Sequence, residues 1–199
     1  MKKSISLLLS VFTIFVSTPA FAAFSPISVS ILPPVQFPAQ DFSITGLRLS
    51  VLYGSQRDVY GFDFGVLGNI TQQTFVGIAV SGLFNINRGM TDIVGAQIAG
   101  LTNWSTQKLD VYGVQLALIS NIVEAESSVN GLQLSLANMA KHTTIRGFQV
   151  GVYNVASKVY GFQVGLVNVV DNLHGLQIGL LNFNHTGLFA VSPVINFGF

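Results

Sequence analysis

The chain has 199 residues, of which 50% are hydrophobic and only 9% are charged, and it contains no cysteine. This composition excludes intrinsic disorder, which requires low hydrophobicity and high charge, and a formal net charge of +1 supplies no basic surface for nucleic acid. Without cysteine, disulfides, thiolate metal sites and a thiol nucleophile are excluded as well. The length suits one domain.

Residues 1–22 are predicted to be a secretory signal peptide. They begin with Lys2 and Lys3, continue with a largely apolar stretch up to Val16, and end with the small residues of Ala20-Phe21-Ala22. A transmembrane helix is the alternative, but it needs about 20 apolar residues, and this stretch is shorter. We therefore expect the chain to be exported and cleaved at the end of this segment.

Residues 23–41 form a proline-rich segment that contains Pro26, Pro33, Pro34 and Pro38. Proline has no backbone N–H to donate, so within sheets it is confined to edge strands, strand starts and bulges. Two interpretations stay open for this segment: an extra edge strand, or a plug.

Residues 42–199 carry a repeated unit. The clearest copies have the pattern Gly-x-Gln-x-small-x-x-Asn and begin at Gly131, Gly147, Gly161 and Gly175. Weaker copies begin at Gly46, Gly61, Gly77, Gly95 and Gly113, and the spacings along the chain are 14 to 18 residues. Self-similarity at such a short period indicates a repeat architecture.

Large apolar residues alternate with amide or small residues in each unit. Phe162, Val164 and Leu166, for example, are separated by a glutamine and a glycine. A period of two with β-branched and aromatic residues indicates a β-strand. The connectors hold turn-forming residues and nearly all of the charges. The pattern predicts an all-β protein.

Two architectures repeat one strand per unit: an antiparallel meander closed into a barrel, and a parallel β-solenoid. A strand from Gly161 to Val169 spans about 25–30 Å at about 3.3 Å per residue, which leaves about five residues of a coil for the return. Splitting the coil into shorter strands would solve this problem, but second halves such as Lys141–Arg146 show little alternation. The constant polarity of the motif, in contrast, favours a parallel stack.

One face of each predicted strand is wholly apolar, and the other carries Gln, Gly, Ser and Ala. In transmembrane β-barrels apolar residues face lipid and polar residues fill the lumen, whereas a soluble sandwich carries charges on its outer face. We therefore predict an antiparallel meander closed as a transmembrane β-barrel of about ten strands over residues 42–199, with a β-solenoid of short repeats as the alternative. In the expected register Gly165 lies opposite Gln149, so that each glutamine side chain faces a residue without a side chain on the neighbouring strand. The side chains expected in the lumen include Gln97, Gln115, Gln133, Gln149, Gln163 and Gln177.

Arg48 and Asp63 are the only charges inside the predicted strand cores. A hairpin around the connector from Gly54 to Val59 makes them diagonal neighbours with backbones about 7–8 Å apart. Because an unpaired charge in a narrow interior is costly, we predict an inward ion pair that fixes this first hairpin. The alternative is a charged constriction for a translocated ion.

Ile195, Phe197 and Phe199 alternate at the end of the sequence. They look like the C-terminal assembly signature of Gram-negative outer-membrane barrels. This similarity implies that the partners are outer-membrane lipid and the barrel-assembly machinery, and that the protein is located in the outer membrane or at the cell surface.

A distinctive series of segments runs through the chain: Pro34–Phe37, Ile44–Gly54 and Val59–Gly65, followed by Gly-Leu-Gln-Ile-Gly-Leu-x-Asn units. Together they resemble a "surface repeat" family of Gram-negative bacteria, spirochaetes included. The resemblance covers Pro34–Asn184, and the chain departs from it in the first units, where Asp63 and Ala79 replace Gln. It implies a surface or outer-membrane location and supplies no catalytic residues.

Residues that commonly carry catalysis do not converge in this pattern. His142, His174 and His185 all lie in predicted connectors, at different ends of the barrel, and have no zinc-ligand spacing. Glu124 and Glu126 share one loop, where solvated charge is a simpler interpretation than a glycosidase pair or a calcium site. We predict no enzyme activity, no cofactor and no metal.

The function expected from these observations is a structural or interaction role for a small outer-membrane β-barrel whose lumen is largely filled. Two alternatives stay open. One is a narrow pore for small solutes, and the other is a secreted or surface β-solenoid that works as a binding module.

Overall fold

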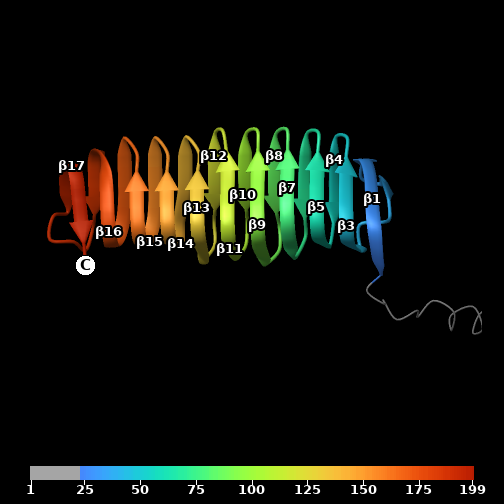
Figure 1. Cartoon of the computed structure of the whole chain (residues 1–199), viewed down its shortest axis with the longest axis horizontal. Coiled ribbons are helices and arrows are strands. Elements are labelled where there is room, and N and C mark those ends of the chain that lie inside the picture. The colour runs from blue at the N-terminus through green and yellow to red at the C-terminus, as the bar shows by residue number, and fades with distance from the viewer. Residues whose placement is uncertain (1–22) are drawn as a thin grey trace, which may run out of the picture.

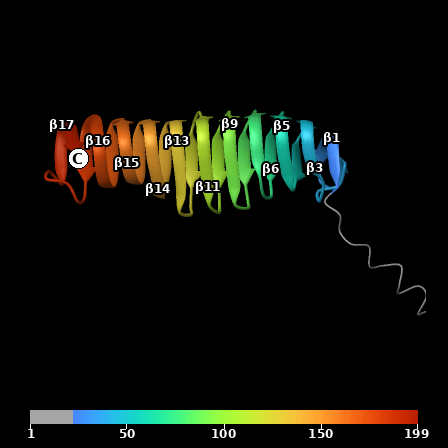
Figure 2. The same cartoon turned by 60° about the horizontal axis from the view of Figure 1, so that its bottom comes forward.

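The structure, a computed structural model, describes residues 23–199, and the predicted signal peptide lies outside the described residues. Seventeen strands of the described part form one continuous sheet. The sheet winds into a parallel β-solenoid, an elongated rod whose coils stack side by side from β1 to β17 (Figure 1 and Figure 2). No helix among these residues is long and apolar enough to cross a membrane.

In the first half of the solenoid each coil contributes one long and one short strand. The long strands are β3 (Ser43–Ser50), β5 (Asp58–Gly65), β7 (Phe75–Ser81), β9 (Thr91–Ala99), β11 (Leu109–Ala117) and β13 (Ser127–Leu134). The short strands are β4 (Tyr53–Gln56), β6 (Gly68–Thr71), β8 (Phe84–Asn87), β10 (Thr102–Ser105) and β12 (Ser120–Val123). Long strands pair in parallel with long strands of the neighbouring coils, and short strands with short ones.

In the second half, the short strand of one coil runs without a break into the long strand of the next. The joined strands are β14 (Ala137–Val150), β15 (Tyr153–Val164) and β16 (Val167–Asn184). They pair in parallel with one another in the same register as the earlier coils.

Antiparallel strands cover both ends of the described stack. β1 (Phe24–Leu32) pairs in parallel with β3, and β2 (Val35–Phe37) folds back onto β1 in antiparallel orientation. The proline-rich segment therefore supplies an edge strand and not a plug. At the other end, β17 (Val191–Gly198) lies antiparallel on β16. Such caps protect strand edges that would otherwise pair with another chain.

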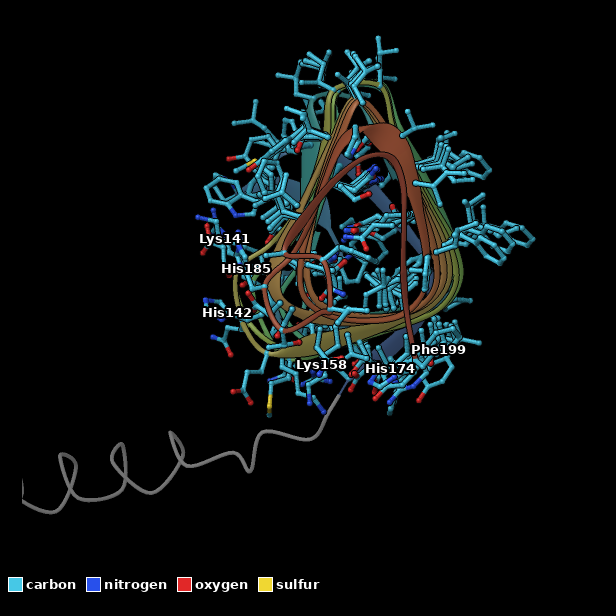
Figure 3. The ribbon with its side chains drawn as sticks, turned by 90° about the vertical axis from the view of Figure 1, so that its left-hand side faces the viewer. Lys141, His142, Lys158, His174, His185 and Phe199 are labelled. Atoms are coloured by element: carbon cyan, nitrogen blue, oxygen red, sulfur yellow. The ribbon has the colours of Figure 1, made fainter. Side chains whose placement is uncertain are left out.

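The prediction of an antiparallel meander closed as a transmembrane β-barrel is wrong, because neighbouring units pair in parallel along an extended stack. A coil of this length closes without a long return segment, because it bends into a triangle of short sides (Figure 3). Lys141–Arg146, which show little alternation, lie within β14 and belong to the third side. The constant polarity of the motif is a direct consequence of the parallel stack.

A row of glycines bends each long strand at one corner of the triangle. From Gly61 to Gly175 the glycines that start the repeats have φ between 129° and 151°, a region that residues with a side chain rarely adopt. A Cβ atom on Gly147 would also collide with the carbonyl oxygen of Gly131 in the preceding coil. The first glycine of each unit therefore sets the shape of the coil.

We expect Gly147→Ala to lower the free energy of unfolding by about 2–4 kcal/mol, since it combines an unfavourable φ with a clash against backbone. Urea denaturation measures this change, with Ser157→Ala, at a partly exposed position of β15, as the control of small effect. An unfolding midpoint that is the same for Gly147→Ala and the wild type would contradict the close approach of the coils at this corner.

The interior contains an apolar stack contributed by the side of the coil that precedes the glycine row. Its members are no more than 2% exposed, and in-register pairing places each one on the next. They are Ile44, Val59, Phe75, Ile93, Val111, Val129, Ile145, Val159 and Leu173. This stack is the apolar core that the repeat builds.

The glutamines predicted to fill a lumen lie in the same interior, where they form a ladder. Gln97, Gln115, Gln133, Gln149, Gln163 and Gln177 are each no more than 2% exposed. Each Nε2 from Gln115 onward donates a hydrogen bond to the Oε1 of the glutamine one coil earlier, at N···O distances of 2.7–3.1 Å. The register in which Gln149 faces Gly165 is therefore wrong: Gln149 pairs with Gln163.

A second ladder of asparagines runs in the opposite direction. Each Nδ2 donates to the Oδ1 of the asparagine one coil later, at 2.8–3.3 Å, from Asn69 to Asn182. The same amide groups also donate to backbone carbonyls, such as Asn138 Nδ2 to Val150 O at 2.8 Å. Buried amides need such pairing, and within the two ladders the amide oxygens without a partner are those at the ends, Asn69 Oδ1 and Gln177 Oε1.

Candidate binding surface

The side of the coil that follows the glycine row presents two rows of apolar side chains to the outside. In-register pairing carries the first row from Ile27 on β1 to Phe197 on β17, and the second from Val29 to Ile195. The first row is Ile27, Leu47, Phe62, Ile78, Ala96, Val114, Leu132, Phe148, Phe162, Leu176 and Phe197. The second is Val29, Leu49, Phe64, Val80, Ile98, Leu116, Leu134, Val150, Val164, Ile178 and Ile195.

The apolar surface continues around the next corner of the triangle, which we call the apex. Leu118, Leu136, Val152, Leu166 and Leu180 project from the apex and are 44–66% exposed. On the far side of the apex, the short strands add a further outward row that includes Ile86, Trp104, Ile122 and Met139. These three rows and the apex together are the apolar ridge.

Polar and charged side chains gather on the third side of the triangle, the base, and at the corner beside it. One polar row of the base is Asp92, Asp110, Ser128, Thr144, Lys158 and Asn172. Figure 3 looks along the stack and shows the separation: carbon-only side chains surround the top corner and the right side, whereas Lys141, His142, Lys158 and His174 lie along the base and the lower left. The exterior is therefore amphipathic.

Charges on the base compensate one another. Lys108 Nζ lies 2.8 Å from Asp110 Oδ2, and Ser128 Oγ donates to Asp110 Oδ1 at 2.7 Å. Partial burial raises the pKa of Asp110, but the hydrogen bonds from Lys108 and Ser128 outweigh burial and bring the pKa below its usual value. In the part of the chain that the structure describes, no three His, Asp or Glu residues are grouped so that they could hold a metal ion.

Arg48 and Asp63 face each other in adjacent coils and are 0% and 1% exposed. Arg48 Nε donates to Asp63 Oδ1 at 2.7 Å, Nη2 contacts Asp63 Oδ2, and Nη1 donates to the carbonyl of Ile70 at 2.9 Å. Burial raises the pKa of Asp63, and the Arg48 guanidinium opposes this rise. The two residues pair directly across parallel strands, so the first hairpin that they were expected to fix does not exist.

Two of the three histidines predicted to lie in connectors lie within strands, whereas His185 lies in the turn after β16. His142 and His174 are within β14 and β16, so their placement in connectors is wrong. His174 stacks on Tyr160 with ring centroids 4.7 Å apart, and His185 Nδ1 lies 3.0 Å from Asp171 Oδ1. None of these contacts assembles a nucleophile with a base.

The acidic pair and the predicted assembly signature also have defined places. Glu124 Oε1 accepts the indole N–H of Trp104 at 2.9 Å, whereas Glu126 lies on the base beside His142 and Lys158. Ile195 and Phe197 extend the two apolar rows onto β17, and Phe199 is 98% exposed.

The asparagine ladder was not predicted from the sequence, although the Asn that ends each repeat is the signal that could have revealed it.

Comparison of the chain with protein-family models, curated proteins and solved structures found no match. The fold and the surface therefore define the class of protein: a parallel β-solenoid with an amphipathic exterior. The resemblance to the surface-repeat family stays a prediction.

Proposed function

We propose that this chain is an exported, surface-associated β-solenoid that works as a binding module, with the apolar ridge as its docking surface. The observation that carries the proposal is the continuity of the two apolar rows, in which every member from β1 to β17 is apolar. Export and a location at the cell surface or outer membrane rest on the pattern of residues 1–22 and on the family resemblance.

The size of the ridge supports a role in binding. A strand spacing of about 4.8 Å and a rise of about 3.3 Å per residue give it roughly 600 Å² between the second and sixth positions of the repeat alone. The largest apolar patch on a typical monomer covers about 300–600 Å² and is often functional. Because the Trp104 row adds to this area, we propose that the ridge is covered when the protein works.

A binding role fits the polar groups better than a catalytic one. Glu124 accepts a hydrogen bond from Trp104, His185 contacts the carboxylate of Asp171, and the ring of His174 stacks on that of Tyr160. Charged groups such as Lys108 and Asp110 lie on the base, where paired surface charges contribute solubility and little stability.

The test is a triple variant on the ridge, Phe148→Thr, Phe162→Thr and Leu180→Thr, expressed with its leader in a Gram-negative host. Threonine keeps the preference for strands, so the fold is retained and the docking surface is weakened. We expect wild type to fractionate with the cell envelope and the variant to appear in the soluble fraction. The matched control carries Asp92→Thr, Lys158→Thr and Asn172→Thr on the base, and it should stay with the envelope.

Circular dichroism of both purified variants checks that the fold is intact. Envelope retention that is equal for the ridge variant and the base variant would overturn the proposal, as would a wild-type protein that is entirely soluble.

A further inference from the structure

The shape of the apolar ridge restricts what can cover it. The ridge is convex, because apolar side chains lie on both sides of the apex: Phe148 and Val150 on one side, and Trp104 and Met139 on the other. A second copy of this rigid prism has the same convex shape and can cover only one side of the apex. A deformable partner can envelop both sides at once.

The borders of the ridge have the composition of a boundary between hydrocarbon and water. Along the glycine corner runs one outward row that contains three tyrosines, each 38–56% exposed. The members of this row are Tyr60, Val76, Val94, Tyr112, Asn130, Arg146, Tyr160 and His174. On the far side of the apex, Trp104 lies in the outermost row of the ridge and donates its indole N–H to Glu124 at 2.9 Å. Tyrosine and tryptophan combine an apolar ring with a polar tip and are enriched at such interfaces.

Charged rows follow directly outside both borders. Asp92, Asp110 and Lys158 lie beyond the tyrosines, and Arg88, Glu124 and Lys141 lie beyond Trp104. On both flanks of the apex, hydrocarbon is therefore followed by a row that contains amphipathic rings and then by a polar row that contains charges. This order matches the change in polarity from the acyl chains of a lipid layer to its headgroups.

The side chains of the two apolar rows that follow the glycines, and those of the apex, are hydrocarbon and carry no hydrogen-bonding groups. Protein interfaces carry about one hydrogen bond per 100–200 Å², and nothing on these rows supplies one. The backbone groups beneath are already paired from coil to coil, as in Leu136 N to Leu118 O at 3.2 Å and Val152 N to Leu136 O at 2.9 Å. Contact with acyl chains requires this internal pairing.

We infer that the occupant of the apolar ridge is a phospholipid layer, into which the apex inserts while the base stays in water. This inference rests on the proposed function and names its partner. The described residues 23–199 carry 7 Lys and Arg against 8 Asp and Glu, a net charge of −1. Electrostatic attraction to anionic lipid therefore adds little, so that apolar insertion dominates the binding.

The experiment is flotation of the purified protein with vesicles of phosphatidylcholine, repeated at high salt and with added phosphatidylglycerol. We expect the protein to float with all three preparations to the same extent. The fluorescence of Trp104, the single tryptophan, should shift to the blue on binding and be quenched by lipids brominated on the upper part of the acyl chain.

Two matched double variants locate the contact. Leu136→Asp with Leu166→Asp places two charges at the apex and should reduce the floating fraction roughly tenfold or more, as expected for charges facing hydrocarbon. Thr144→Asp with Asn172→Asp adds the same charge on the base and should float like wild type. Equal urea unfolding midpoints of the two variants show that the loss is not due to unfolding.

The outcomes separate this inference from the proposed function. A protein that does not float, but forms dimers in sedimentation equilibrium that the apex charges abolish, overturns the lipid inference and keeps the binding module. The lipid inference and the proposed function are both overturned if the protein neither floats nor self-associates and if the ridge variants do not change its retention by the envelope. Flotation that depends on phosphatidylglycerol or disappears at high salt also contradicts insertion of the apolar ridge.

Discussion

Asp63→Asn is expected to lower the free energy of unfolding by about 3–5 kcal/mol, because the Arg48 guanidinium would stay buried without its counter-ion. Replacing both residues by glutamine is expected to cost less than either single replacement. The two positions belong to the row that Gln97 and its successors fill, so neutral amides there can pair as they do further along.

Urea denaturation of wild type, Asp63→Gln, Arg48→Gln and the double glutamine variant measures the coupling as a thermodynamic cycle, and Asp63→Asn is measured beside them. The coupling between the two positions should amount to a large part of the single losses. Losses that simply add would contradict a direct buried ion pair between Arg48 and Asp63.

Asn138→Leu should have the second large effect, a loss of about 3–5 kcal/mol. The substitution leaves Asn154 Oδ1 without its donor, and it removes the acceptor of Ser135 Oγ and one of the acceptors of Asn121 Nδ2. Each buried polar group that loses its partner costs about 1–3 kcal/mol.

The start of the same ladder supplies the control. Asn69 Oδ1 has no partner, and Asn69 Nδ2 makes two long contacts of 3.3 and 3.4 Å, so Asn69→Leu should cost only about 1–2 kcal/mol. Chemical denaturation compares the two variants. An equal loss at both positions would mean that the ladder is not the source of the stability.

Much of the fold could be predicted from the sequence, since the repeat, its strand character and its two faces are visible in the period of two. Phe162 and Leu166 face outward and Gln163 faces inward, as the alternation indicates. The same alternation fits a barrel in lipid and a solenoid with an apolar exterior, because both put apolar residues outside and amides inside. Strand direction therefore had to come from another signal.

Two features of the chain favour the parallel direction. A motif with constant polarity is what in-register stacking requires, because Gln163 must meet Gln149 and Asn168 must meet Asn154 for their amides to pair. The glycine with positive φ, such as Gly161, lets one strand turn a corner, so a coil of 14 residues closes with short sides. A positive φ cannot be seen in a sequence.

The candidate surface was predictable in its sidedness and not in its shape. Apolar positions such as Phe148 and Leu180 are outward in both architectures, but a barrel would have spread them around a closed wall. Stacking of triangular coils instead collects them around one apex and leaves Lys158 and Asp110 on the base. The polarity of the exterior therefore depends on the bend at the glycine row.

The in-register parallel stack, on which the ladders and the ridge both depend, is tested most directly by disulfide trapping. The chain has no cysteine of its own, and neighbouring strands lie about 4.8 Å apart, within the range that a disulfide spans. The structure predicts that Phe148→Cys with Phe162→Cys oxidises readily, because these two residues are direct partners. Preferential oxidation of Phe148→Cys with Leu166→Cys, the pair that an antiparallel register with Gly165 opposite Gln149 would join, would contradict the parallel solenoid.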